Sequence, residues 1–394
     1  MRVIRIGNFQ QWQALAPQWE ALTPRHPLLT PAWLEPWWRH YGPTTSDSSA
    51  RQELYLLAVR DDDGRLAGVA PWYVERSRCR GAIVRFLGAG EVCSDDLTLP
   101  CRPGLESKVA RAVADWMLPQ PNGSARSPRP TEDRWNLLAL SGIDRQDPTM
   151  THFFDACRQR GAIVHRRQTH NCWTIDLPDC WEAYVSGLSK SHRKRVRRLD
   201  RVYFQSGRVR RQEANDGASL DRGFSILVNL HSKRWQIRDQ PGVFAATRFA
   251  AFHQDVARAM LDHGWLRLSW LELEGRPIAA EYQFARDRGV YAYQSGMDPE
   301  MADHQPGNLS MMATVHHSIE RGERSIDLMR GDEPYKAHWR ARPRPSVELR
   351  ILPPQPTNHL RQQIWLARES GKQWLRTATR RDGHAPNEIT TKPG

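Results

Sequence analysis

The residues that could do chemistry gather near the end of the chain, between residues 290 and 339. A single glycine, Gly307, stands where a loop enters a predicted helix. A polar cluster follows the next predicted strand and comprises Asp332, Glu333, Tyr335, Lys336 and Trp339. Backbone N–H groups at a helix start attract anions, and ligands of open α/β sheets collect at strand ends. The spacing therefore predicts a site for a phosphate-bearing ligand.

Two titratable residues upstream are further candidates. Glu281 lies in a predicted strand of otherwise apolar or neutral residues, where burial would raise its pKa toward neutrality. A structural ion pair with a nearby arginine explains Glu281 equally well. His231 lies on the apolar face of a predicted helix with Trp235, and Arg234 is beside it. A histidine in that position is more often a hydrogen-bonded core residue than a catalyst, so His231 is a minor candidate.

Three predicted elements position this cluster. Residues 290–295 alternate between two faces, which predicts a strand that ends at Gly296. Pro306 and Gly307 open a helix that Gly322 closes, and residues 325–329 form a short buried strand before Gly331. The helix start and the polar cluster therefore both follow strand ends.

A basic run covers residues 189–211, where Asp200 is the only acid. Ser189 or Ser191 would cap a helix with a buried stripe formed by Leu188, His192, Val196, Leu199 and Tyr203. A solvated helix face is the ordinary interpretation of such a run. Its charge density favours a phosphate-binding role, because an anion would relieve the repulsion. Nucleic acid, coenzyme and nucleotide-linked substrate stay open as the anion.

Composition sets the outer limits on function. The 394 residues include 57 Lys and Arg against 44 Asp and Glu, a net charge of +13 that favours anionic partners. Six cysteines without a C-x-x-C pair or a zinc pattern fit a reducing cytoplasm, and we expect no metal. The sequence contains neither an apolar leader nor a run of about 18 apolar residues, which argues against export and membrane spanning.

The order of predicted elements repeats along the chain. A hairpin of residues 53–60 and 65–75 turns near GRLAG, and a second hairpin of residues 265–273 and 276–286 turns near GRPIA. We infer a duplicated α/β unit with domains at 1–160 and 161–352. Residues 119–130 read as a loop, and 353–394 as a linker, a basic amphipathic helix at 360–381 and a disordered tail. That helix would dock on the second domain or, alternatively, contact a membrane surface.

These motifs together resemble a known superfamily. The segments GRPIAAEYQF, YAYQSGMDPEMADHQPGN, GDEPYK, HSKRW and SKSHRKRVRR resemble the GNAT-superfamily acetyltransferase-like proteins of the CelD type, found in cellulose and exopolysaccharide clusters. Fem-type aminoacyl transferases of the same superfamily are the competing assignment. The resemblance implies two tandem GNAT-like domains, the first degenerate, with mixed, mainly antiparallel sheets flanked by helices.

The resemblance also implies where a thioester donor binds. Residues 293–296 would be a strand that splays from its neighbour, and residues 305–309 the loop that holds the diphosphate. The donor contacts implied are Ser295, Gly296, Gln305, Gly307, Asn308, Arg193 and Arg197. A single glycine departs from the usual glycine-rich loop and weakens diphosphate binding. An acyl carrier protein or aminoacyl-tRNA is therefore an alternative to acetyl-CoA or another acyl-CoA.

The implied function is acyl transfer to an amine or hydroxyl acceptor, such as a saccharide, in exopolysaccharide or cell-envelope biosynthesis. Glu281 would be the base and Tyr335 the proton donor. Asp327, Asp332 and Glu333 would help to orient the acceptor, and Lys336 would bind a phosphate. The residues expected to bind substrate are His231, Arg234, Trp235, Asp332, Lys336 and Trp339. The alternatives are a Fem-like aminoacyl-tRNA-dependent transferase and a non-catalytic module that binds anions or nucleic acid.

Overall fold

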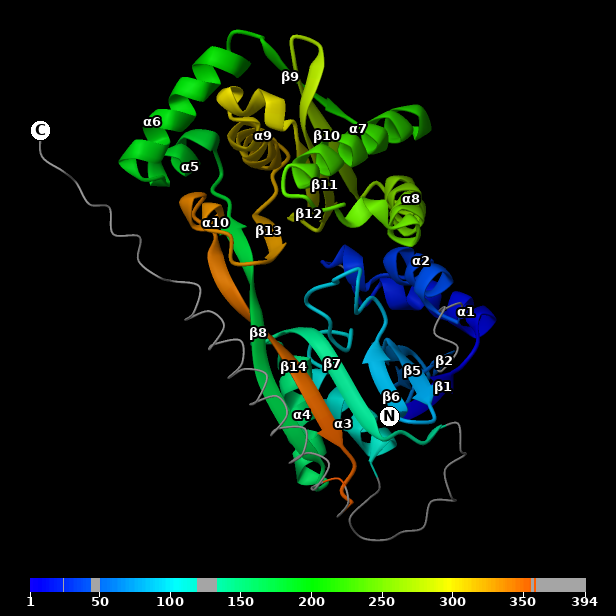
Figure 1. Ribbon diagram of the computed structural model, residues 1–394. Coiled ribbons are helices and arrows are strands. Elements are labelled where there is room, and N and C mark those ends of the chain that lie inside the picture. The colour runs from blue at the N-terminus through cyan, green and yellow to red at the C-terminus, as the bar shows by residue number, and fades with distance from the viewer. Residues whose placement is uncertain (24, 44–49, 119–132, 356–357, 359–394) are drawn as a thin grey trace, which may run out of the picture.

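A computed structural model describes residues 1–23, 25–43, 50–118, 133–355 and 358 (Figure 1). The loop expected at 119–130, the basic helix expected at 360–381 and the tail beyond it lie outside the described residues. None of the helices within the described ranges is both long enough and apolar enough to span a bilayer. All six cysteines fall in the described ranges and are free thiols.

Two helices of the first half, residues 1–160, begin at residues that cap them. Asn8 accepts a hydrogen bond from the Gln11 backbone N–H at 2.9 Å, and Asp147 accepts one from Met150 at 2.6 Å. The elements of this half are β1 (Arg2–Ile6), α1 (Phe9–Glu20), η1 (Pro27–Leu29), α2 (Pro31–Tyr41), β2 (Ala50–Leu54), β3 (Leu56–Arg60), β4 (Leu66–Ala70), β5 (Trp72–Ser77), β6 (Gly81–Phe86), α3 (Glu106–Met117), β7 (Leu137–Asp144) and α4 (Pro148–Gln159).

The second half, residues 161–352, contains the predicted basic helix as α6. Ser189 caps α6 by accepting a hydrogen bond from the His192 N–H at 3.4 Å, and the predicted stripe is buried. The elements of this half are β8 (Ile163–Asp176), α5 (Trp181–Gly187), α6 (Lys190–Leu199), η3 (Asp200–Phe204), β9 (Val209–Glu213), α7 (Gly217–Gln236), η4 (Val243–Ala245), α8 (Thr247–Asp262), β10 (Leu266–Leu273), β11 (Arg276–Arg286), β12 (Gly289–Met297), η5 (Pro299–His304), α9 (Pro306–Glu320), β13 (Ser325–Arg330), α10 (Tyr335–His338) and β14 (Arg342–Leu352).

The two predicted hairpins differ in their continuity. Glu274 and Gly275, with φ of 53° and 85°, form the tight turn between β10 and β11. The hairpin of the first half is interrupted at Tyr55 and Pro71. Its parts next to the turn, β3 and β4, form a three-stranded sheet with β1, in which β3 lies between β1 and β4, while β2 and β5 join the main sheet.

The main sheet has 11 strands in the order β2-β5-β6-β7-β14-β8-β13-β12-β11-β10-β9 (Figure 1). Its pairs are antiparallel except for β6 with β7 and β12 with β13. The expected α/β fold with a mixed, mainly antiparallel sheet is therefore confirmed. An α-helix lies in the connection of each parallel pair, α3 between β6 and β7 in the first half and α9 between β12 and β13 in the second. This repeated order agrees with a duplicated unit.

Two long strands tie the halves together. β14 lies between β7 and β8, so a strand from the end of the second half completes the sheet of the first. β8 pairs with β14 along most of its length and with β13 over residues 172–176. The boundary expected between residues 160 and 161 thus falls just before a strand that both halves share.

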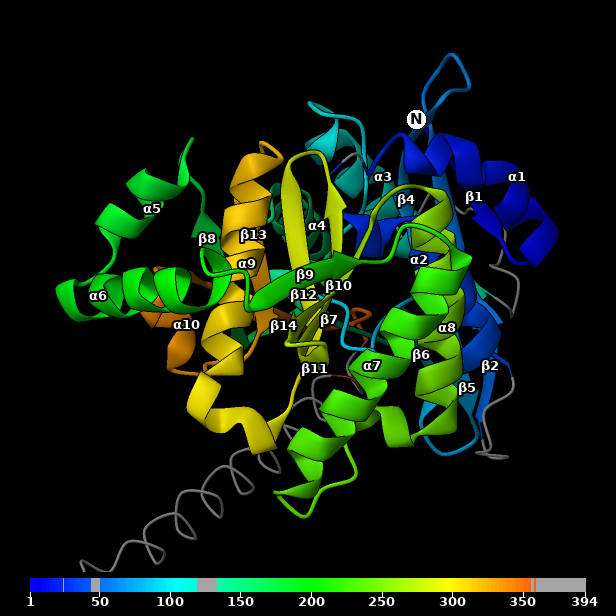
Figure 2. The ribbon, with the colours of Figure 1, turned by 90° about the horizontal axis from the view of Figure 1, so that it is seen from above.

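Helices cover both faces of strands β10–β12 (Figure 2). Helices α7 and α8 lie on one face, where Leu227 and Phe252 share a core with Tyr282 and Phe284. Helices α5, α6 and α9 lie on the other face with a separate apolar core. The first core continues into the first half, because the Trp33 ring of α2 packs against the Phe252 ring at 5.2 Å.

Candidate active site

Strand β12 leaves its parallel partner β13 after a short paired stretch. Pairing runs from Gly289 opposite Ser325 to Tyr291 opposite Asp327 and stops there. β12 continues along β11 on its other side as far as Met297. Residues 292–297, here called the splayed segment, therefore have a strand neighbour on one side only within the described sheet. The splay implied at 293–296 is present.

Glu281 of β11 lies directly across the ladder from Ser295 of the splayed segment. Its Oε1 accepts a hydrogen bond from the Ser310 hydroxyl of α9 at 2.6 Å. Burial raises the pKa of Glu281 to about 7, against the opposing effects of hydrogen bonds from Ser310 and Gln283 and the charge of Arg234. Within the described residues Glu281 forms no direct ion pair, so the structural salt bridge considered for it is not formed. Its carboxyl group can exchange a proton near neutral pH.

Arg234 and Tyr335 approach Glu281 from different elements. Arg234, in the last turn of α7, points NH1 at the Ser295 hydroxyl, 3.5 Å away. Tyr335, at the start of α10, is 43% exposed. Burial of the phenol and the charges of Glu281 and Glu333 raise its pKa to about 12, while Arg234 lowers it. Tyr335 therefore keeps its proton at neutral pH.

The start of α9 follows directly behind this group. Gln305 precedes the helix with left-handed φ and ψ of 55° and 52°, and no side chain caps the helix. The backbone N–H groups of Asn308 and Leu309 donate back to the Gln305 carbonyl at 3.0 and 3.1 Å. Gly307 leaves room for Met297, whose Cε would lie 3.2 Å from a Cβ at that position. The first turn carries no acidic residue, so an anion could approach the Gly307 N–H.

Two other predicted residues serve packing instead. A Cβ on Gly296 would lie 2.7 Å from the His231 backbone nitrogen, so Gly296 lets α7 cross the strand closely and is covered by it. His231 is 2% exposed, and its Nε2 accepts a hydrogen bond from Trp235 Nε1 at 3.0 Å. Burial, with a smaller effect of Arg234, lowers the pKa of His231 to about 4. His231 is thus a neutral core residue, as its helical position favoured.

The side chain of Lys336 also makes structural contacts. Its Nζ donates to the carbonyl oxygens of Met329, Arg330 and Gly331 at 3.2, 2.9 and 2.9 Å. The side chain is 2% exposed and pairs with Glu333 at 3.0 Å. Lys336 therefore ties the turn after β13 together and does not reach toward a phosphate.

The other members of the polar cluster point away from Glu281. Asp332 accepts hydrogen bonds from Asn171 Nδ2 at 2.8 Å and from Trp173 Nε1 at 3.0 Å, both on β8. Trp339 is 2% exposed, and its ring packs 4.6 Å from the ring of His192. These residues stabilise the end of β13 and the base of α6.

Arg193 and Arg197 lie on α6, outside the group around Glu281. Arg193 NH1 donates to the Ser186 carbonyl at 2.9 Å, and Arg197 pairs with Glu182 at 3.6 Å, both on α5. The far end of this segment approaches the start of α9, because the Tyr203 hydroxyl lies 2.9 Å from His304 Nδ1. The basic helix thus flanks α9 without contacting Glu281 in the described structure.

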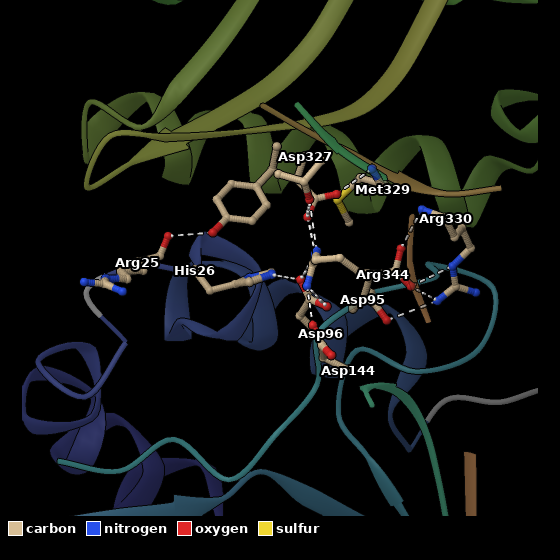
Figure 3. Close-up of polar contacts among 12 residues, drawn as sticks. Arg25, His26, Asp95, Asp96, Asp144, Asp327, Met329, Arg330 and Arg344 are labelled. Atoms are coloured by element: carbon tan, nitrogen blue, oxygen red, sulfur yellow. Dashed lines mark hydrogen bonds and ion pairs between the residues drawn. The ribbon is translucent and has the colours of Figure 1, made fainter. Parts of the chain in front are cut away.

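Asp327 belongs to a buried network between the halves. Arg344 of β14 contacts Asp327, Asp96 and Asp144, which come from three separate segments (Figure 3). Burial and the charge of Asp96 raise the pKa of Asp327 to about 6, and Arg344 opposes them. Asp327 Oδ1 also accepts from the Met329 N–H at 2.7 Å. Asp327 is fully engaged there and does not face an acceptor.

A cluster that the sequence pattern does not reveal lies beside this network. Asp95, His170 and Cys172 offer ligand atoms within 4.8 Å of one another. Asp95 is already neutralised by Arg330, whose Nε and NH2 donate to its Oδ1 at 2.8 and 2.6 Å (Figure 3). Burial and the charge of Asp95 raise the pKa of the Cys172 thiol well above its usual range. A guanidinium group and a protonated thiol do not favour a cation, so we assign no metal role to these residues.

A surface hollow of about 990 Å³ lies in the first half, beside α3. Two of its acids are paired, Asp61 with Arg102 and Asp62 with the N-terminal amine. No residue of the group around Glu281 lines it.

Sequence patterns missed the polar residues of α9 that face β11. Ser310 and Thr314 are one helical turn apart, and Thr314 Oγ1 accepts a hydrogen bond from Gln283 at 3.1 Å. The signal was available, since hydroxyl residues four apart on a helix match Glu281 and Gln283 two apart on a strand.

Comparisons with known proteins agree with this geometry. Residues 190–337 match the family described as an acetyltransferase (GNAT) domain. No curated protein sequence matches the chain. The structure is similar to the crystal structure of FemX, with a TM-score of 0.59, 11% identity and coverage of 91% of this chain and 99% of that one. A conserved protein of unknown function from Bacteroides thetaiotaomicron has a TM-score of 0.51, 10% identity and coverage of 89% and 100%. The second half therefore carries the match to the GNAT acetyltransferase domain, and the chain as a whole has a fold similar to that of FemX.

Proposed function

We propose that the chain is an acyltransferase that moves an acyl group from a thioester donor to an amine or hydroxyl acceptor. The observation that carries the proposal is the carboxyl group of Glu281. It has a pKa of about 7, accepts a hydrogen bond from Ser310 and lies across from the splayed segment. A base whose pKa matches the working pH combines a useful ionised fraction with a strong pull on the proton.

In the proposed reaction Glu281 accepts the proton of the amine or hydroxyl group as that group attacks the thioester carbonyl carbon. The carbon–sulfur bond then breaks, and Tyr335 donates its proton to the leaving thiolate. A phenol with a pKa of about 12 stays protonated until that step. Solvent then takes the proton from Glu281 and restores the proton of Tyr335. Arg234 lies near both groups and would hold Ser295 and the local charge balance during these transfers.

The start of α9 offers few backbone N–H groups to the diphosphate of a coenzyme A donor. The proposed donor contacts are Ser295, Gln305, Gly307 and Asn308, with Arg193 and Arg197 supplying positive charge at longer range. In the first turn only the Gly307 N–H is offered, because Pro306 has none and the next two N–H groups bond to Gln305. An acyl carrier protein therefore stands beside acyl-CoA as the proposed donor.

The CelD-type resemblance supports a place in exopolysaccharide or cell-envelope biosynthesis, in the cytoplasm, with a saccharide or amine as acceptor. A second candidate is transfer from aminoacyl-tRNA. It is favoured by the exposed basic side chains of α6 and the likeness of fold to FemX. If the chain does not catalyse transfer, the basic surface of α6 would make it a module that binds anions or nucleic acid.

A donor screen tests the proposal. Wild type and Glu281→Gln are incubated with acetyl-CoA, acyl carrier protein thioester or aminoacyl-tRNA, each with a mixed set of amine and sugar acceptors, and products are read by mass spectrometry. We expect transfer from a thioester and a loss of about 10²- to 10⁴-fold in the variant. Transfer from aminoacyl-tRNA alone selects the second candidate. Equal rates in wild type and variant, or no transfer by wild type, would reject catalysis through Glu281.

A charge-reversal pair on α6 separates the donors further. Arg195 and Arg198 are exposed on this helix, so Arg195→Glu with Arg198→Glu removes basic surface while the buried stripe stays intact. Transfer from tRNA should then weaken strongly and show a shallower salt dependence, whereas transfer from acetyl-CoA should change little. Lys108→Glu with Arg111→Glu on α3 is the matched control.

A further inference from the structure

The hydroxyl group of Ser310 has one notable partner, the carboxylate of Glu281. Its Oγ donates to Oε1 at 2.6 Å, within the short range typical of hydrogen bonds to an ionised acceptor. Ser310 is 5% exposed, so water competes little for this hydroxyl group. The bond therefore forms in a nearly dry contact between α9 and β11.

The backbone around Ser310 is held rigidly. Its neighbours Leu309 and Met312 are 0% and 1% exposed and belong to the apolar core on this face of the sheet. One turn further along, Thr314 accepts a hydrogen bond from Gln283 at 3.1 Å. Two side-chain hydrogen bonds, one turn apart on α9, thus join this helix to β11. Of these two, only the bond from Ser310 involves a titratable group.

The other groups that face Glu281 come from separate elements. Arg234 reaches it from α7 through its charge, Tyr335 from α10, and Gln283 from β11 itself. Ser295 of β12 lies opposite on the ladder. Ser310 differs from these groups because it donates a short hydrogen bond, 2.6 Å long, directly to Oε1 of Glu281.

We propose that Ser310 is a positioning residue, which fixes one orientation of the Glu281 carboxylate and stabilises its ionised form through this hydrogen bond. The role rests on the proposed function, in which Glu281 takes the proton of the acceptor. Because Ser310 donates to Oε1 from a buried position on α9, it restricts rotation of the Glu281 carboxylate. The low exposure of Ser310 argues that it orients the base and is not itself acylated.

Removing the hydroxyl should shift the titration of Glu281 upward. A hydrogen bond to a charged group contributes enough that its loss moves a pKa by about one unit. In Ser310→Ala we expect the acid limb of the kcat/KM profile to rise by about one pH unit, with activity below that limb about tenfold lower. Ser310→Thr keeps the donor and should restore the limb. Thr314→Ala, one turn away, should leave it unchanged.

A direct measurement separates this role from the proposed activity. Titration of ¹³C-labelled glutamate carboxyl groups by NMR, with Glu281→Gln for assignment, follows the pKa of Glu281 without any substrate. An upward shift in Ser310→Ala supports the role even if no acyl transfer is found, in which case only the proposed function fails. An unchanged titration overturns the role whatever the activity.

Two further outcomes keep the test decisive. Ser310→Cys retains volume with a weak donor, so it replaces the alanine variant if that variant unfolds, and it should also shift the titration upward. A wild-type titration in the cysteine variant overturns the proposal. A stoichiometric acyl adduct on Ser310 in wild type, found by peptide mass spectrometry after mixing with donor, overturns it too, because Ser310 would then be a nucleophile.

Discussion

The phenol of Tyr293 donates a hydrogen bond to the backbone carbonyl of Val92, so a loop of the first half holds the splayed segment of the second. The same loop supplies Asp95, which binds Arg330 at the end of β13. Both strands that separate at the splay are therefore fixed from the first half. That half therefore helps to fix the backbone around the proposed site.

Tyr293→Phe tests this support. The substitution keeps the ring but leaves the buried Val92 carbonyl without its donor, which should lower the free energy of unfolding by about 1–2 kcal/mol. We also expect lower kcat/KM, because the splayed segment loses its anchor. Urea unfolding and steady-state assays measure the two effects.

Tyr291→Phe is the matched control for that change. Tyr291 donates to the Arg25 carbonyl at 3.0 Å, in a more exposed contact on the paired part of β12. Tyr291→Phe should lower the free energy of unfolding less than Tyr293→Phe does, and it should leave kcat/KM unchanged. Equal effects of the two variants on kcat/KM would contradict a special role for the Val92 contact.

The pH dependence of the reaction should report Glu281. With a pKa of about 7, the base is mostly protonated at pH 6 and mostly ionised at pH 8, so kcat/KM should rise across that range. Tyr335, with a pKa of about 12, should produce no alkaline limb below pH 10. Tyr335→Phe should lower the rate and keep the acid limb. A limb that survives in Glu281→Gln would assign it to another group.

Glu281 should also make stability depend on pH. The pKa is about 7 in the folded chain, against about 4.3 for an unfolded glutamate, so the folded state binds more protons between those values. The free energy of unfolding of wild type should therefore fall as pH rises through that window. Glu281→Gln lacks this loss and should gain up to about 3 kcal/mol relative to wild type by pH 8. Urea unfolding at a series of pH values gives the difference, and a constant difference would refute the raised pKa.

Lys336→Met distinguishes a structural from a ligand-binding lysine. Loss of three carbonyl contacts at a residue that is 2% exposed should lower the free energy of unfolding by about 2–4 kcal/mol. Donor KM, measured below the melting range, should stay within about twofold, because Nζ does not face the site. Lys190→Met on the exposed surface of α6 serves as control and should change stability by about 0.5 kcal/mol or less. A large rise in donor KM with intact stability would restore a phosphate-binding role.

Local patterns predicted the elements that carry the site. The apolar spacing and flanking glycines of α9, the turn at Glu274 and Gly275, and the stripe of α6 are decided by neighbours within a few residues. Glu281 could be singled out for the same reason. An acidic residue in an otherwise apolar strand is unusual, and this can be recognised from the local sequence alone.

The polar cluster shows where local reasoning ends. Lys336 and Asp332 carry suitable groups, yet which way each points depends on β8 and the turn after β13, far away in sequence. Ser310 was missed because a serine in a helix gains meaning only when a strand places Glu281 opposite it. The pairing of β14 with β7 of the first half could not be predicted either. The alternation of apolar residues in a strand does not indicate which strand it pairs with.

The pairing of β14 with β7 has a consequence for folding during synthesis. β7 receives its neighbour β14 only after residues 342–352 have been synthesised, when the whole second half already exists. Until then the nascent first half carries an open β edge, the kind of surface that recruits other strands and chaperones. The two halves should therefore mature in a single late step, although the order of their elements repeats.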